Sequence, residues 1–186
     1  MALEATFRGL TARLHQLNDA VNALHITLDD KPAYDEAAVA DDLSAKTLDF
    51  LGLLHEARRA AVKARQALRH PPDMDQARRS LVQCQERFHD IDQKFAMNLV
   101  SYETLKELAR VGGRGAEWSA WAASTKRGIE ECREPLDAAN QALAACWQEL
   151  AERLGMMSIS VRQKIVGQQI AVPKAKVGDL ETEGVT

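Results

Sequence analysis

The 186-residue chain has few aromatic residues, only 5% of the total, and few β-branched ones. Both kinds of side chain favour strands, so their scarcity argues against a sheet. Alanine and leucine dominate a composition that is 46% hydrophobic and 27% charged. This composition predicts a helical protein, and the length suits one domain with a sizeable core.

No uncharged apolar run approaches the roughly 18 residues that a membrane span needs. The first residues carry Glu4 and lack the apolar core of a secretion signal. Three cysteines, an odd number without metal-site spacing, favour a reducing compartment, so we expect a cytoplasmic protein with no membrane partner. A net charge of −3 argues against bulk electrostatic binding of nucleic acid, although a local patch remains open.

Four segments repeat apolar residues at alternating steps of three and four, the heptad pattern of packed helices. The repeats run from Leu3 to Leu28, from Val39 to Leu68, from Ala77 to Ala109 and from Trp118 to Leu154. Proline or glycine separates or ends them. The pattern predicts an all-α fold, an elongated antiparallel up-down-up-down four-helix bundle over residues 1–155. Two helical hairpins docked side by side are the alternative topology. Residues 156–186 lack heptads and are expected to form an extended or partly disordered tail.

Three positions have local consequences for these helices. Asp73 is predicted to cap the third helix. Pro135 removes a backbone hydrogen bond inside the fourth and should bend it, either as a tolerated kink or as a hinge. Gly155 is expected to end that helix.

The spacing Glu86-x-x-His89 is the one with which helical bundles hold iron or manganese. With Phe88 at heptad position a, Glu86 falls at f and His89 at b, and both positions face solvent. A di-metal bundle needs such ligands pointing inward, and the chain has no second motif of this kind. We therefore expect no metal and no other cofactor.

The sequence also lacks the motifs of nucleophilic and phosphate chemistry, and the function expected is non-catalytic. The cysteines lie on the apolar seams, where they are expected to be small buried hydrophobes. In an antiparallel bundle, Cys84 and Cys146 fall at a similar height.

Three seam positions are polar: Thr47, Asn98 and Thr125. In the predicted topology they lie at similar depths from one end of the bundle. They are interpreted as a hydrogen-bonded layer that fixes helix register. A buried ligand site centred on Asn98, or no contact among the three, are the alternatives.

The second helix carries more apolar residues than its seam requires. Leu48 and Val62 fall at outward position b with His55 between them, and Leu51 lies at e. Such a stripe indicates a covered surface, either by the C-terminal segment or by another chain, unless these are scattered exposed residues.

The C-terminal segment could itself bind a partner's sheet or clasp a neighbouring subunit, or be a poorly ordered terminus. Its candidate contact residues are Ile159, Val161 and Ile165.

Positive charge gathers at one end of the predicted bundle. Its arginines are Arg58, Arg59, Arg65, Arg69, Arg78 and Arg79. A solvated end of mixed charge is one interpretation, and contact with a nucleic-acid backbone or an acidic protein is the other.

The leading hypothesis is a non-catalytic adaptor or subunit of a larger assembly, binding protein through the second helix and the C-terminal segment. The alternatives are an accessory subunit that contacts nucleic acid through the basic end, and a bundle sensor with a ligand in the polar layer. The sequence leaves homo-oligomerisation open.

Overall fold

The computed structural model describes residues 2–32, 38–69, 71–95 and 116–155 of the chain. All regular secondary structure in these ranges is helical, which confirms the all-α class. The helices are α1 (Ala2–Asp29), α2 (Ala38–Ala67), α3 (Met74–Lys94), α5 (Ala116–Glu131) and α6 (Arg133–Leu154).

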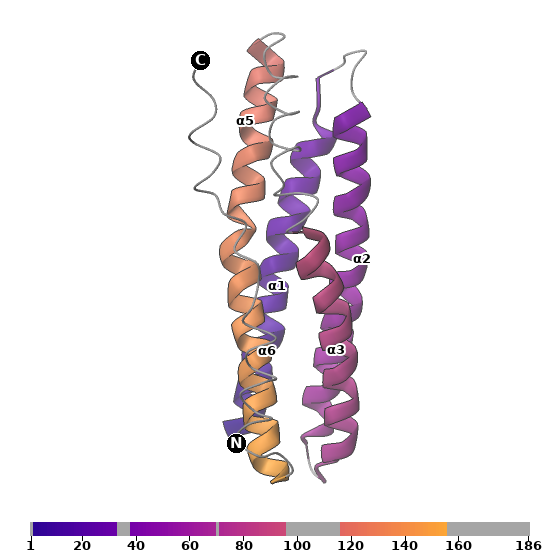
Figure 1. Ribbon diagram of the computed structural model, residues 1–186, viewed down its shortest axis with the longest axis vertical. Coiled ribbons are helices and arrows are strands. Elements are labelled where there is room, and N and C mark those ends of the chain that lie inside the picture. Colours follow the sequence, from indigo (N-terminus) through magenta and orange to yellow (C-terminus); the bar gives the residue numbers. More distant parts are fainter. Residues whose placement is uncertain (1, 33–37, 70, 96–115, 156–186) are drawn as a thin grey trace.

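The helices lie along one long axis (Figure 1). In that view α1 runs upward from the N-terminus, α2 returns downward, α3 runs upward again, and α5 and α6 descend in succession. α1 packs against α2, α5 and α6, α2 packs against α3, and α3 contacts α6. These directions and neighbours are consistent with the predicted antiparallel order. No helix in the described ranges is long and apolar enough to cross a membrane.

The predicted seams form the core. All eight α1 seam residues from Leu3 to Leu28 are buried, and α2 buries its seam from Leu43 to Ala64. The rings of Phe50 on α2 and Phe95 at the end of α3 meet with centroids 5.5 Å apart. Each fully buried leucine or phenylalanine stabilises the fold by about 1.5–3 kcal/mol.

Two predicted helix ends are confirmed. The Asp73 side chain accepts a hydrogen bond from the backbone N–H of Gln76 at 2.8 Å and so caps α3. Gly155 ends α6 with a φ of 58°, a left-handed conformation that glycine adopts without the steric cost of a Cβ atom.

The fourth segment is divided into α5 and α6 at Cys132, where the sequence predicts one bent helix. Pro135 has no N–H to offer the carbonyl of Glu131. Cys132 N–H bonds Ile129 O at 3.3 Å, and helical bonding resumes with Leu136 N–H donating to Cys132 O at 3.1 Å. The interruption is therefore local, and α6 continues in the direction of α5 (Figure 1).

Candidate functional site

A cluster of four polar side chains joins α1 to α2. Nδ1 of His25 lies 3.1 Å from Thr47 Oγ1 and 3.2 Å from Ser44 Oγ. Nε2 of the same ring lies 3.4 Å from Asp29 Oδ2, and the Ser44 hydroxyl donates to Asp29 Oδ1 at 2.5 Å. Thr47 is fully buried, whereas 19% of the His25 side chain and 59% of the Asp29 side chain are exposed. The cluster therefore extends from the core to the surface.

The hydrogen bonds in the cluster determine which atoms donate. The Thr47 hydroxyl donates to the backbone carbonyl of Ser44 at 2.8 Å, and the Ser44 hydroxyl donates to Asp29. Each hydroxyl oxygen is then left as an acceptor, so Nδ1 of His25 carries a proton and donates to both. The contact between Nε2 and Asp29 becomes an ion pair when the ring carries its second proton.

The cluster contains the residue types of a hydrolase triad but lacks its arrangement. In a triad the serine hydroxyl gives its proton to the histidine, whereas here Ser44 donates directly to Asp29. Ser44 also lies inside α2, where backbone N–H groups are used by the helix and offer no oxyanion hole. We therefore assign the cluster to fixing α1 against α2.

Two large apolar side chains flank this cluster. Ile26 on α1 is 60% exposed and Leu48 on α2 is 58% exposed. Ile26 follows His25 and Leu48 follows Thr47, so the 3.1 Å contact between His25 and Thr47 holds both apolar residues at the same level of the bundle. We refer to Ile26 and Leu48 as the apolar pair.

The outward stripe predicted on α2 is described throughout its length. Leu48 and His55 are exposed, and Leu51 and Val62 are half-buried. All four lie on α2, and Leu51 packs partly against the core. Exposed and half-buried positions therefore alternate along the stripe.

Charge changes sign along α2. Its first half carries Asp41, Asp42 and Asp49, whereas residues 57–69 contain lysine and arginine but no acidic residue. Asp41 is bonded to Lys31, and Asp42 to Lys46 at 2.6 Å. No ion pair to Asp49 occurs among the described residues. The first half of α2 therefore keeps unneutralised negative charge.

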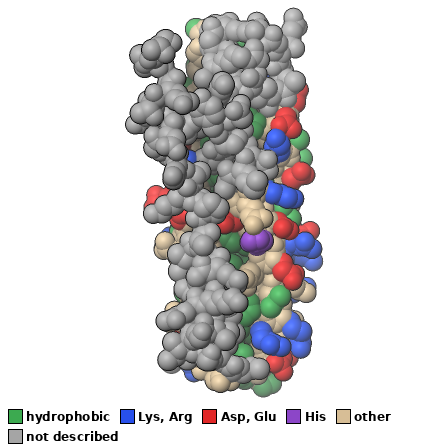
Figure 2. All heavy atoms as spheres, in the orientation of Figure 1, with side chains coloured by type: hydrophobic (Ala, Val, Ile, Leu, Met, Phe, Trp, Pro, Cys, Tyr) green, Lys and Arg blue, Asp and Glu red, His purple; other side chains and the backbone are tan. Residues whose placement is uncertain are grey.

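The predicted basic end of the bundle, on α2 and α3, keeps its charge as well. Within the described ranges none of the six predicted arginines forms an ion pair; Arg59, Arg69, Arg78 and Arg79 are exposed, and Arg58 and Arg65 are half-buried. On the face drawn in Figure 2, Lys and Arg side chains are interspersed with Asp and Glu along the right-hand side. That face therefore shows mixed charge rather than a continuous basic patch.

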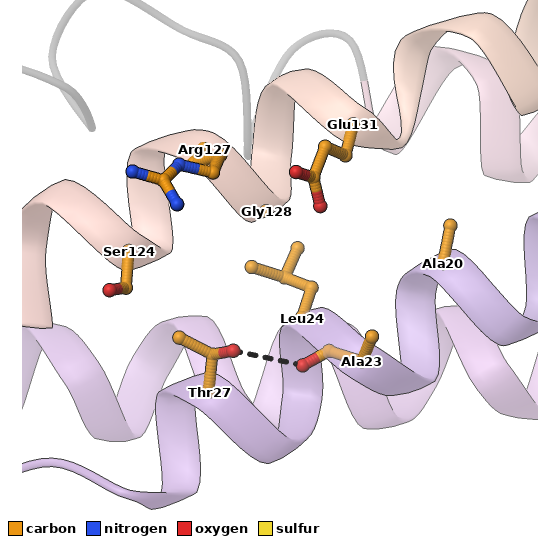
Figure 3. Close-up of a pocket in the computed structure, with 8 residues that line it drawn as sticks. All are labelled: Ala20, Ala23, Leu24, Thr27, Ser124, Arg127, Gly128 and Glu131. Carbon is orange, nitrogen blue, oxygen red and sulfur yellow. Dashed lines mark hydrogen bonds between the residues drawn. The ribbon is translucent and has the colours of Figure 1, made fainter.

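A shallow groove of about 270 Å³ lies between α1 and α5 (Figure 3). Leu24 and Glu131 point into the space between the helices. A Cβ atom on Gly128 would lie 3.1 Å from Leu24 Cδ1, so this glycine permits the close approach of the two helices. The groove is smaller than most ligand pockets and open, and Thr125 does not line it. It is a weaker candidate site than the surface of α1 and α2.

Trp121 fixes α5 to the end of α1. Its indole N–H donates to the backbone carbonyl of Thr27 at 3.0 Å, and the ring is only 6% exposed. The last carbonyls of a helix have no partner within the helix, so this bond satisfies one of them from outside.

The polar layer is described at two of its three positions. Thr47 and Thr125 are both fully buried, and Asn98 lies outside the described residues. Thr47 finds its partners in His25 and Ser44, while the Thr125 hydroxyl has no hydrogen-bond partner among the described residues. The three-residue layer therefore stays a prediction.

All three cysteines are buried free thiols. Burial raises the pKa of Cys84 to about 12 and that of Cys132 to about 12. Burial, the nearby Cys84 and the charge of Glu149 together raise the pKa of Cys146. The influence of Cys84 on Cys146 is consistent with the similar height that an antiparallel order gives the two residues. These thiols are protonated at neutral pH and are poor nucleophiles.

One carboxyl group lies partly buried beside α6. Burial raises the pKa of Asp92 on α3, the charge of His89 opposes this, and the carboxylate of Asp137 on α6 adds to it. Oδ1 of Asp92 is buried without a hydrogen-bond partner in the described structure.

Glu86 and His89 are both exposed, in agreement with the outward positions assigned from the heptad. Within the described ranges, no three residues of the kinds that bind metal come together. The outward orientation of Glu86 and His89 removes both from the interior of the bundle, where a di-metal site would need them.

The C-terminal contact residues Ile159, Val161 and Ile165 lie outside the described residues, so their role stays a prediction. Sequence reasoning missed His25, Ser44 and Asp29 because it surveyed only the seam. The available signal was that His25 follows the seam residue Leu24 and that Ser44 follows Leu43, which places both on the helix edge next to the core.

Comparison with protein-family models, with curated proteins and with solved structures finds no match for this chain.

Proposed function

We propose that the chain is a non-catalytic helical bundle that binds protein through the outer surface of α2, as an adaptor or as a subunit of a larger assembly. The observation that carries the proposal is the apolar pair, Ile26 and Leu48, exposed by 60% and 58% on adjacent helices at one level. Covering such side chains gains about 25 cal/mol for each Å² of apolar surface removed from water.

The cluster beneath the pair supports the same proposal. His25 bonds Thr47 and Ser44 across the boundary between α1 and α2, so the two helices are held in fixed register there. A surface that is already rigid loses little entropy when a partner binds, which favours affinity. The C-terminal segment is proposed as a second contact, through Ile159, Val161 and Ile165.

Leu48→Glu tests the proposal directly. The variant should keep the helical circular dichroism of the wild type, since the position is exposed, and should lose a partner that co-purifies with the wild type from its own cells. Val82→Glu is the matched control, because Val82 is an apolar residue of α3 that is 40% exposed. Equal partner recovery with Leu48→Glu and the wild type would refute a role for this surface.

Removal of residues 157–186 tests the second contact. Loss of the partner with an unchanged helical signal supports binding through this segment. Loss of the helical signal instead would assign the segment to the core.

A second candidate is contact with a nucleic-acid backbone, favoured by arginines of α2 and α3 that form no ion pair among the described residues, such as Arg59 and Arg78. Backbone binding weakens steeply with salt because counterions are released, whereas docking of apolar surfaces does not. Binding of a duplex that falls with ionic strength, and that is lost in Arg59→Glu, would favour this candidate.

A further inference from the structure

The outward residues along α2, which we call the outer row, read in a similar pattern from either end. Four residues of α2 recur at seven-residue intervals and lie on one face of the helix, and a fifth follows seven residues later, just past the end of α2. They are Asp41, Leu48, His55, Val62 and Arg69. Inverting the order about His55 exchanges leucine with valine and exchanges an acid with a base.

We infer that the partner of this face is a second copy of the chain, with α2 packed antiparallel against α2 of the other protomer and His55 on the two-fold axis. This inference rests on the proposed function, and it names the partner. In such an isologous interface Leu48 of each protomer lies opposite Val62 of the other. The same arrangement brings Asp41 near Arg69 of the partner subunit.

The exposure of the residues fits this arrangement. Leu48 is 58% exposed, His55, Asp41 and Arg69 are exposed, and Val62 is half-buried. The outer row from Asp41 to Arg69 is therefore at least partly accessible in the single chain along its whole length. Its centre is the apolar and histidine portion, and its ends are charged, as in interfaces with an apolar core and a polar rim.

Charge complementarity extends beyond the stripe. Asp49 and Lys63 lie at heptad position c, on the same flank of the stripe, and each is seven residues from Glu56. Antiparallel pairing about His55 brings Asp49 level with Lys63 of the partner subunit, within about half a turn. Both side chains are exposed, and neither forms an ion pair in the described part of the single chain.

A parallel arrangement would give the opposite result. It would place the acidic half of α2 on the acidic half of the other copy and the basic half on the basic half. Like charges face to face are repulsive, so the charge reversal along α2 selects the antiparallel orientation.

Charge reversal at Asp49 and Lys63 provides a sharp test. The wild type should form a concentration-dependent dimer in sedimentation equilibrium. Asp49→Lys alone and Lys63→Asp alone should each weaken dimerisation by about tenfold or more, because each places two like charges together at both symmetric contacts. The double variant should restore the wild-type dissociation constant.

Mixing the two single variants gives the most specific result. In the mixed dimer each of the two contacts again joins one acidic and one basic side chain, so the mixture should dimerise more tightly than either variant alone. Glu117→Lys, at an exposed position of α5, is the control and should leave the dissociation constant unchanged. A mixture no tighter than its components would overturn the antiparallel geometry.

Cross-linking locates the two-fold axis. His55→Cys places two new thiols opposite each other, and they should form an intermolecular disulfide under mild oxidation. The native thiols do not compete, since Cys84, Cys132 and Cys146 are fully buried. Ala123→Cys, exposed on α5, is the matched control and should remain unlinked.

The outcomes separate this inference from the proposed function. A wild type that stays monomeric up to about 1 mM overturns self-association. If Leu48→Glu then still abolishes recovery of a different protein, the proposed function stands with another partner. If the chain dimerises but Leu48→Glu and the charge variants leave the dissociation constant unchanged, the inference is wrong, and recovery of a different protein with Leu48→Glu then decides the proposed function.

Discussion

Oγ1 of Thr47 lies 3.1 Å from Nδ1 of His25, and this contact joins the core of α2 to the edge of α1. Thr125 occupies an equally buried position on α5, yet its hydroxyl has no hydrogen-bond partner in the described structure. The two threonines therefore allow a direct comparison of a buried hydroxyl that is hydrogen-bonded with one that is not.

Thr47→Val should lower the free energy of unfolding by about 1 kcal/mol, since it removes a satisfied hydroxyl and one acceptor of the His25 ring. Thr125→Val should leave the free energy of unfolding unchanged or raise it, because an unpaired buried hydroxyl is costly. Urea denaturation measures both. A loss at Thr125 as large as that at Thr47 would indicate a partner beyond the described residues and would support the polar layer with Asn98.

Gly128 and Gly9 form a second matched pair. A Cβ at Gly9 in α1 meets nothing within 4 Å, so Gly9→Ala should raise the free energy of unfolding by about 0.5–1 kcal/mol through higher helix propensity. At Gly128 the new methyl meets Leu24 Cδ1 at 3.1 Å, and Leu24 is fully packed at 1% exposure. Gly128→Ala should therefore gain less than Gly9→Ala or lose stability. Thermal or urea unfolding compares them, and equal gains would refute the close approach of α1 and α5.

The buried thiols predict a loss of stability at alkaline pH. The pKa of Cys84 is raised by burial from its usual value of 9.0 to about 12 in the folded protein. The unfolded chain therefore releases the thiol proton first, and the free energy of unfolding falls as pH rises between 9.0 and about 12. Cys84→Ala should reduce this slope, although it costs packing at all pH values. Thiol reagents should label the folded protein at about pH 8 only at the rate of unfolding.

The raised pKa of Asp92 predicts that the free energy of unfolding also depends on pH in the acidic range. Burial and the charge of Asp137 raise the pKa of Asp92, so the folded state favours the protonated carboxyl. The contribution of Asp92 to the free energy of unfolding is fully present below the pKa that this carboxyl has in the unfolded chain. It is lost as pH rises through the raised pKa of the folded state. Asp92→Asn should remove that loss, and Asp137→Asn should reduce it. Urea unfolding over an acidic to neutral pH series measures the change, and NMR titration of the Asp92 carboxyl gives an independent reading. A pKa of Asp92 below its usual value would contradict the assignment.

Much of the fold was predictable from the chain because heptad spacing is a local property. Residues three and four apart share a helix face, so the seams from Leu3 to Leu28 and from Leu43 to Ala64 were identified without knowing their partners. The same reasoning placed Glu86 and His89 on the outer surface, and the preference of aspartate for the N-cap placed Asp73 at the start of α3. The division of the fourth segment at Cys132 went beyond the predicted bend, because the effect of a proline on the preceding turn depends on local packing.

The sequence by itself determined which face of the described helices is buried, where α3 begins and α6 ends, and which half of α2 carries each charge. The tertiary structure decided which polar edges meet, and so brought His25, Asp29 and Ser44 together and set Ile26 and Leu48 at one level of the bundle. The physical reason is that these contacts depend on the rotation and axial register of two helices packed together, and a heptad fixes the rotation only to within a face and leaves the register free.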